Sequence, residues 1–284
     1  MNEALERWAG RGAGEQEISI SVLIPCWHGE RTIRTALDSV ESQHGLPVGL
    51  GIEIVLVVDG RWEDYATIRD LLAETSQARR WPITVLRLPQ RQGVGAARAA
   101  GYVYCRGQYL ALLDDDDVWH PDKLATQWHW HQDHPSCIAS CHGYQQSIPE
   151  RDISLRRWLI GGCMAATPTV MINRACWPYE PERFCFGEDW LMLAMIAHRH
   201  PIHALPAQLA WRSPLAPPSC RDTHGLSRQH WRLRLAMVRN LLLLSQRGVL
   251  AWGWIPMLLL WQLVLILRRL ALSITNSIKN ESNA

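Results

Sequence analysis

The feature that most constrains the fold is an alternation of apolar runs and helical stretches through the first half of the chain. The runs are 18–24, 52–58, 83–88 and 109–113, and the first three contain several β-branched residues. Helical stretches are predicted between them. Apolar residues recur at spacings of four and three in 33–40, and two further stretches follow at 63–77 and at 94–105, the last of which is rich in small residues. Strands that alternate with helices predict an α/β architecture in which helices cover both faces of a mostly parallel sheet. Pro25 is expected to end the first strand.

Composition narrows the class of protein. A chain of 284 residues with 48% hydrophobic and 20% charged residues can bury a sizeable core, so dominant disorder is excluded. A formal charge of +2 excludes nucleic-acid binding driven by bulk charge. The eight cysteines are scattered and do not form a disulfide scaffold, so a reducing cytoplasmic setting is expected.

Three regions follow from the distribution of polar and apolar residues. Residues 1–17 form a polar lead without the apolar core of a signal peptide. Residues 18–220 are predicted to form the α/β domain, with helices at 121–134 and 189–197 and a proline-broken, loop-rich connector at 201–218. Residues 221–284 are predicted to be a basic amphipathic and hydrophobic region.

The most informative motif is the run of four carboxylates from Asp114 to Asp117, directly after the strand 109–113. A solvated acidic turn is the simpler interpretation of a charge run. However, ligands of open α/β sheets bind at the carboxyl ends of the strands. A cluster of acids there is stabilised by a hard divalent cation, so we expect Mg²⁺ or Mn²⁺ to bridge the acids to a diphosphate.

Two further signals lie at the same predicted edge. The segment 25–28 (Pro-Cys-Trp-His) follows the first strand, and Asp59-Gly60 follows the second. An aromatic face beside an acceptor carboxylate suits a nucleobase. Core packing of Trp27 and a turn role for Asp59 are the alternatives.

Five segments, in this order, resemble family 2 glycosyltransferases of the GT-A (Rossmann-like) fold. They are 20–28, 53–60, 92–101, 107–117 with Pro121, and 187–191. The resemblance covers about residues 18 to 212 and implies a single GT-A catalytic domain. It also implies an inverting, nucleotide-sugar-dependent transferase.

The resemblance assigns the nucleotide contacts by position. Pro25, Cys26 and Trp27 would cradle the base, with Trp27 standing where the family often has tyrosine. Asp59 matches the second acid of the family's Asp-Asp-Gly turn and would contact the base or ribose, whereas Val58 replaces the first acid.

The same resemblance assigns the diphosphate, metal and base. Arg98 would bind the diphosphate, and the Asp-X-Asp motif is covered by Asp114, Asp115 and Asp116. Asp115 would contact the ribose and Asp116 the metal. Asp189 would be the catalytic base, with Glu188 beside it, although an acidic helix N-terminus is common for structural reasons alone.

The implied function is sugar transfer from a nucleoside-diphosphate sugar to a glycan or lipid-linked acceptor, in cell-surface polysaccharide synthesis. In the implied mechanism Asp189 deprotonates the acceptor hydroxyl, which attacks the anomeric carbon in line. A catalytically silent nucleotide-sugar-binding membrane scaffold is the alternative. The segment 93–98 only approaches a dinucleotide fingerprint, so a dehydrogenase is disfavoured.

Histidines and cysteines within residues 129–142 are residue types that could form a zinc site. Their spacing is not that of a zinc finger, so buried thiols and a solvated polar helix are the preferred interpretation.

The C-terminal region predicts a membrane partner. Residues 249–267 carry no charge and would span about 28 Å as a helix, close to the roughly 30 Å hydrocarbon thickness. Arginines flank an upstream stripe of Trp231, Leu235, Val238 and Leu242, as in a helix that lies on an anionic surface. We therefore expect the chain at the cytoplasmic face of a membrane, peripheral or with a single span. The alternative is a tryptophan-rich helix packed on protein.

Overall fold

The computed structural model describes residues 4–10, 17–75, 79–161, 165–177, 187–216 and 228–264, with the backbone alone for 228–234. Contacts divide the chain into two compact units, 1–216 and 217–284. The boundary predicted at 220 falls outside the described residues.

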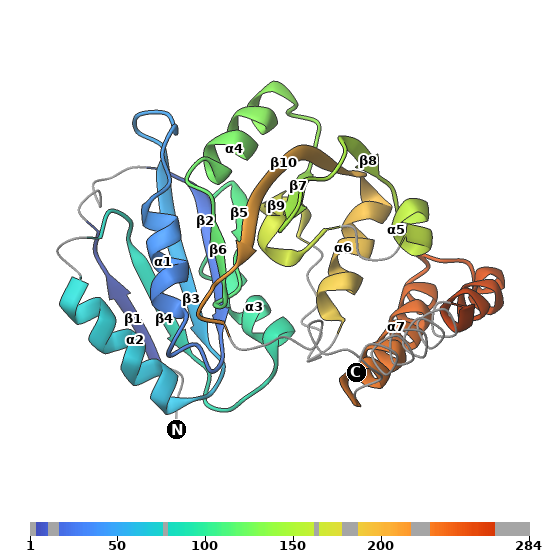
Figure 1. Ribbon diagram of the computed structural model, residues 1–284, viewed down its shortest axis with the longest axis horizontal. Coiled ribbons are helices and arrows are strands. Elements are labelled where there is room, and N and C mark those ends of the chain that lie inside the picture. Colours follow the sequence, from blue (N-terminus) through green and yellow to red (C-terminus); the bar gives the residue numbers. More distant parts are fainter. Residues whose placement is uncertain are drawn as a thin grey trace, which may run out of the picture. The chain divides into compact units, whose positions relative to one another are not determined.

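The first unit is built on one mixed sheet (Figure 1). In spatial order its strands are β1 (Ala4–Trp8), β4 (Ile83–Arg87), β3 (Gly51–Val58), β2 (Ile18–Cys26), β5 (Tyr109–Leu112), β9 (Met171–Asn173), β7 (Ala139–Tyr144), β10 (Ile202–Arg212) and β6 (Asp117–Trp119), and β8 (Arg151–Ile153) pairs with β10. Strands β4, β3, β2 and β5 run parallel to one another, which confirms the predicted parallel centre. Strand β9 pairs antiparallel with both β5 and β7, so the sheet changes character on that side.

Helices cover both faces of the parallel strands. The helices of this unit are α1 (Ile33–Glu41), α2 (Trp62–Thr75), α3 (Val94–Tyr102), α4 (Lys123–Asp133), α5 (Leu155–Gly161) and α6 (Glu188–Arg199). Helices α1 and α2 bury their apolar stripes against one face, which includes Ile24, Ile54 and Leu56. Helix α3 packs on the opposite face, because Gly101 lies against Leu23 and Val57. The alternation of exposure along β2 and β3 is lost, as expected for strands buried on both faces.

Gly101 sets how closely α3 approaches the sheet. A Cβ at this position would lie 2.4 Å from Leu23 Cδ1 and 2.6 Å from Val57 Cγ2. The helix therefore lies closer to the strands than any larger residue would allow.

Three segments differ from the sequence expectations. Strand β2 continues through Pro25 to Cys26, in register with Val57 and Val58 of β3. Strand β10 occupies much of the predicted loop-rich connector, because Pro206 falls where the ladder to β7 shifts register between Ala204 and Gln208. A proline is tolerated at such an irregularity, since no ladder hydrogen bond is needed there. Part of the predicted polar lead forms β1, which pairs antiparallel with β4.

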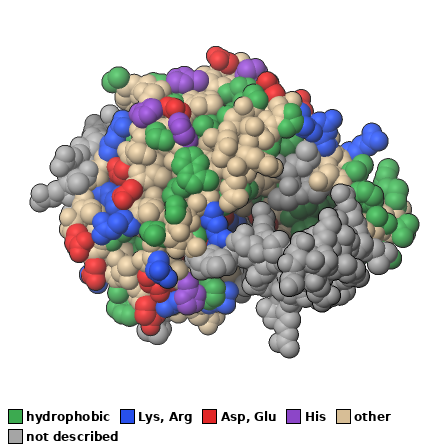
Figure 2. Space-filling view, viewed as in Figure 1, with side chains coloured by type: hydrophobic (Ala, Val, Ile, Leu, Met, Phe, Trp, Pro, Cys, Tyr) green, Lys and Arg blue, Asp and Glu red, His purple; other side chains and the backbone are tan. Residues whose placement is uncertain are grey.

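The second unit contains α7 (Arg228–Gln246), a 3₁₀ turn at Trp252–Trp254 and a helix at 255–264. Large apolar side chains are exposed at its surface, and Figure 2 shows hydrophobic side chains gathered there. Trp252 is 56% exposed and Leu260 is 62% exposed. Within the described part of the chain, no helix is both long and apolar enough to cross a membrane. The last three residues of the predicted hydrophobic stretch 249–267 lie outside the described residues.

Candidate active site

The predicted site residues gather at the carboxyl edge of the parallel strands. Trp27 follows β2, Asp59 follows β3, and the acidic turn 114–116 follows β5. Because these strands are parallel, their carboxyl ends lie along the same edge of the sheet. The sequence therefore located this edge correctly.

The four consecutive acids do not share one environment. Asp117 begins β6 and is buried, where the hydroxyl of Tyr144 donates a 2.6 Å hydrogen bond to its Oδ1. Burial, together with the charge of Asp114, raises the pKa of Asp117 to about 8. Residues 114, 115 and 116 remain partly exposed. Asp117 thus supports the turn, and its three predecessors are the groups available to a ligand.

Asp115 ties the acidic turn to the end of β2. Its Oδ2 accepts a 3.0 Å hydrogen bond from the backbone N–H of Trp27. A Cβ at Gly29 would lie 2.6 Å from the same oxygen, so the loop after β2 passes very close to this carboxyl group. Burial and the neighbouring charge of Asp116 raise the pKa of Asp115 to about 7.

Of the three residues predicted to cradle a base, Trp27 alone is exposed. Pro25 and Cys26 are the last two residues of β2 and are buried. Burial, reinforced by Asp115, raises the pKa of the Cys26 thiol well above its usual value. Trp27 is 39% exposed, and the guanidinium of Arg91 lies 3.5 Å from the centroid of its ring. Trp27 is therefore the one residue of these three with an exposed aromatic side chain, and the base contacts of Pro25, Cys26 and Trp27 stay predictions.

Asp59 is buried and holds a loop in place. Its Oδ1 accepts from the backbone N–H of Gln92 at 2.7 Å, and its Oδ2 accepts from that of Gly93 at 2.8 Å. These bonds order the loop that leads into α3. A contact of Asp59 with base or ribose stays a prediction.

Arg98, on α3, joins two acidic segments. Its Nη2 lies 2.6 Å from Asp114 Oδ1, and its Nη1 lies 3.1 Å from Glu188 Oε1. Burial acts to lower the pKa of Arg98, but the charges of Asp114, Glu188 and Asp189 outweigh it and raise the pKa. The predicted diphosphate contact of Arg98 remains untested by this geometry, which instead places both ends of the guanidinium on carboxylates.

Helix α6 begins with the predicted catalytic pair. Glu188 and Asp189 form its first turn after Gly187, whose φ of 74° favours glycine. Burial raises the pKa of Glu188 to about 7, and Asp189 adds to the rise. Asp189 Oδ1 accepts from the backbone N–H of Trp190 at 2.7 Å. Of the two carboxylates, Glu188 is the one held by Arg98.

Asp116 is the carboxylate most accessible to a cation. Its side chain is 40% exposed, and its Oδ2 lies 3.4 Å from Nη2 of Arg212 at the end of β10. Burial and the charge of Asp114 raise the pKa of Asp116, so the unprotonated group is destabilised where it stands. A divalent cation relieves such repulsion, and carboxylate oxygens are the donors that Mg²⁺ and Mn²⁺ prefer. The donor chemistry therefore fits a divalent metal.

The protein would supply few of the ligands to such a metal. Among the described residues, no group of three or more His, Cys, Asp or Glu side chains is arranged to hold a metal ion. A metal at Asp116 would thus depend on oxygen atoms of a diphosphate and on water, as is usual for Mg²⁺.

Three contributors to this site were given no role from the sequence. Arg212 reaches Asp116, Arg91 stacks on Trp27, and Tyr144 supports Asp117. Asp117 could have been distinguished by its place at the start of a strand. No local pattern marks Arg91 or Tyr144, because their partners are distant in the sequence.

Comparisons with known proteins bear on the family and the fold of the chain. The family model described as glycosyl transferase family 2 matches residues 21–197. The succinoglycan biosynthesis protein ExoW of Rhizobium meliloti is 41% identical over 112 residues, 38% of this chain and 33% of ExoW. The chain spans about a third of the length of several curated relatives that it matches.

Solved structures share the fold. S. aureus TarS 1-349 in complex with UDP-GlcNAc has a TM-score of 0.61 at 16% identity, over 80% of this chain and 67% of TarS. The mannosyltransferase PcManGT of Pyrobaculum calidifontis, in complex with GDP-Man and Mn²⁺, has a TM-score of 0.58 at 15% identity, over 98% of this chain and 83% of PcManGT. The predicted α/β fold of GT-A type is confirmed. Since the family model matches more than half of its length, the chain belongs to glycosyl transferase family 2.

Proposed function

We propose that this protein transfers a sugar from a nucleoside-diphosphate sugar to a glycan or lipid-linked acceptor, with inversion, in the synthesis of a cell-surface polysaccharide. The observation that carries the proposal is that Arg98 brings the acidic turn and the Glu188–Asp189 pair together at the carboxyl edge of the sheet. A donor bound at the turn would then face a carboxylate able to take a proton from the acceptor.

Each candidate site residue has a proposed role that follows from its position. Trp27 offers its exposed ring to the base, and Asp59 orders the loop beneath it. Asp116, together with the diphosphate, would hold Mg²⁺ or Mn²⁺. The metal, when bound, supplies electrophilic stabilisation of the leaving diphosphate. Asp189 receives the acceptor proton, and no covalent intermediate with the protein is required.

Two solved neighbours guide the choice of donors to test. TarS is bound to UDP-GlcNAc in its structure, and PcManGT is bound to GDP-Man and Mn²⁺. A screen of UDP- and GDP-sugars by thermal shift, with and without Mn²⁺, is therefore the first experiment. A ligand at one hundred times its dissociation constant stabilises a folded protein by about 2.7 kcal/mol.

Transfer is tested next, with membrane extract as the source of acceptor. The expected result is release of nucleoside diphosphate from one donor, dependent on the acceptor, with the opposite anomeric configuration in the product by NMR. Retention of configuration would contradict the inverting mechanism. Donor binding without turnover in any extract would favour the silent scaffold.

We also propose that the second unit holds the protein at the cytoplasmic face of a membrane. Its exposed apolar residues support this localisation. They are Trp252, Trp254, Met257, Leu260, Trp261, Leu263 and Val264. Of these, Trp252 and Trp254 suit the headgroup boundary of a membrane. In water such a cluster is unfavourable unless a partner covers it.

Fractionation tests the membrane proposal. Full-length protein should sediment with anionic vesicles at low salt, and a truncation after Ser227 should stay in the supernatant. Full-length protein that remains in a high-speed supernatant with and without vesicles would contradict it.

A further inference from the structure

The backbone of Arg98 is held in place by contacts near both ends of α3. It lies in the middle of α3, and its residue is only 4% exposed. One end of the helix is ordered by the Asp59 hydrogen bonds to Gln92 and Gly93. Near the other end, Gly101 allows the helix to touch the strands. The backbone of Arg98 therefore has little freedom to follow a ligand.

The two ends of the guanidinium reach segments that are far apart in the sequence. Asp114 is 16 positions from Arg98 and belongs to the turn after β5, while Glu188 is 90 positions away and opens α6. A guanidinium is planar and presents its donors as a rigid fork, so it sets both the distance and the angle between two carboxylates. A lysine carries the same charge on a single nitrogen and cannot reproduce this geometry.

The link is needed because the segments it joins repel each other. Asp114 has further acids at the next three positions, and Glu188 is followed by Asp189. The only described side chain that bridges the two sets with hydrogen bonds in the structure is Arg98. Removing the bridge would leave like charges facing each other at the start of α6.

We propose that Arg98 is a positioning residue: it fastens the first turn of α6 to the acidic turn through Glu188 and Asp114, and so places Asp189 over the donor. The inference rests on the proposed function for its catalytic consequence. The fastening itself is a property of the protein without ligands. A direct contact with the diphosphate is a different role and predicts a different result.

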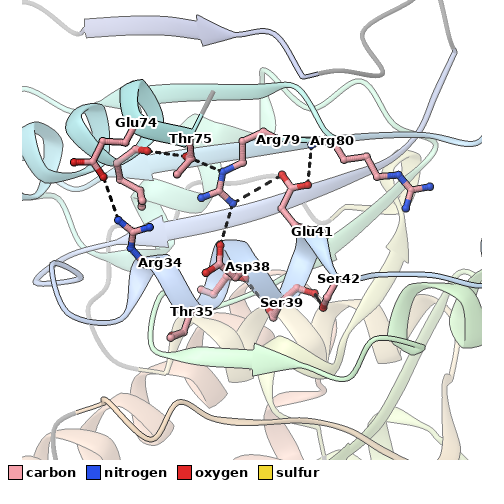
Figure 3. Close-up of polar contacts among 12 residues, drawn as sticks. Arg34, Thr35, Asp38, Ser39, Glu41, Ser42, Glu74, Thr75, Arg79 and Arg80 are labelled. Carbon is pink, nitrogen blue, oxygen red and sulfur yellow. Dashed lines mark hydrogen bonds and ion pairs between the residues drawn. The ribbon is translucent and has the colours of Figure 1, made fainter. Parts of the chain in front are cut away.

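The test compares Arg98→Lys with Arg79→Lys. Arg79 is a matched control, because its side chain is 6% exposed against 5% for Arg98 and it also contacts two carboxylates, Asp38 and Glu41. Figure 3 shows this second cluster between α1 and the end of α2, formed without any of the candidate site residues. Both substitutions remove a planar guanidinium with two donor ends and keep a positive charge at that position.

Hydrogen exchange of the protein without ligand measures the fastening. In Arg98→Lys, peptides that cover 187–192 and 112–118 should exchange at least about tenfold faster, while those of β3 and α2 keep their wild-type rates. In Arg79→Lys, the peptides 187–192 and 112–118 should be unchanged. If peptide 187–192 of Arg98→Lys exchanges at the wild-type rate, the proposal is overturned, whether or not the protein is active.

Kinetics and binding then separate positioning from direct contact. Positioning predicts that kcat falls about 10- to 100-fold in Arg98→Lys, because small displacements of a reacting group have effects of this size. The dissociation constants of UDP and GDP with Mn²⁺, measured by calorimetry, should stay within about threefold of wild type. A larger loss of nucleotide affinity with unchanged kcat would overturn positioning in favour of diphosphate contact. Failure of the wild-type protein to bind or turn over any nucleotide sugar would refute the proposed function alone, since the exchange result still decides the fastening.

Discussion

Mild acid should destabilise the first unit through His131. The side chain is fully buried on α4, with Nε2 3.0 Å from the hydroxyl oxygen of Ser140 and no hydrogen-bond partner for Nδ1 among the described residues. Burial lowers the pKa of His131 to about 4, and the charge of Lys123 acts in the same direction. The native protein therefore keeps this imidazole neutral at pH values where a free histidine is charged.

The sign follows from comparing the folded and unfolded states. Well above the unfolded pKa of about 6.5, the ring is neutral in both states and contributes no pH dependence. As the pH falls from there toward the folded pKa, the unfolded chain binds a proton that the native protein does not, so the free energy of unfolding decreases. A depression from 6.5 to about 4 corresponds to about 3 kcal/mol of stability lost across this window.

Other groups act in the opposite direction. Burial raises the pKa of Asp115 and of Glu188 to about 7, so protonation of these carboxyl groups stabilises the folded state as the pH falls. The pH profile of the wild-type protein is a sum of both effects. The contribution of His131 is therefore isolated as the difference between the wild-type protein and His131→Leu.

Urea unfolding of the full chain, from about pH 7.5 down to about pH 4.5, measures this difference. Near pH 7.5 the variant should be less stable by about 1 kcal/mol, because the bond to Ser140 is lost. Near pH 4.5 the order should reverse, because the unfolded variant has no imidazole at position 131 to bind a proton. His129→Leu is the control, since His129 lies on the same helix and is exposed. Wild-type and His131→Leu profiles that run parallel over this range would refute the reasoning.

Three further outcomes are expected. Asp116→Ala should remove the Mn²⁺-dependent part of the thermal shift by a nucleotide sugar while the unliganded melting temperature changes little; full activity in excess EDTA would contradict the metal role. Asp189→Asn should lower kcat by about 10²- to 10⁴-fold with donor affinity near normal, and a wild-type rate would show that another group is the base. Lys123→Met should raise the free energy of unfolding at neutral pH by about 1–3 kcal/mol, because Lys123 is fully buried and its Nζ has no hydrogen-bond partner among the described residues; a stability loss in urea unfolding would indicate that the cation–π contact of Nζ with the Trp119 ring is the stronger effect.

The sequence by itself determined the parallel centre of the sheet and the edge along which the candidate site residues lie. Runs such as 52–58 are rich in β-branched residues and apolar at every position except Glu53, a local pattern that is typical of a strand buried on both faces. The acids after 109–113 follow such a run directly, so their position at a carboxyl end required only the direction of one strand. Both inferences rest on residues that are neighbours in the chain.

Tertiary structure decided everything that depends on distant partners. Strand β10 forms in spite of Pro206, because β7 supplies its ladder and a register shift absorbs the proline. His131 was expected in a solvated polar helix, yet it is buried, since the face of α4 that points inward is set by the strands beneath it.

The roles within the acidic cluster were decided in the same way. Asp117 accepts a hydrogen bond from the Tyr144 hydroxyl, Asp115 accepts one from the backbone N–H of Trp27, and Asp114 accepts one from Arg98. The four carboxylates are chemically identical in the sequence, so no local pattern could tell them apart. Charge and burial at each position come from groups brought there by folding, and these determine which acid supports the fold and which remains accessible to a ligand.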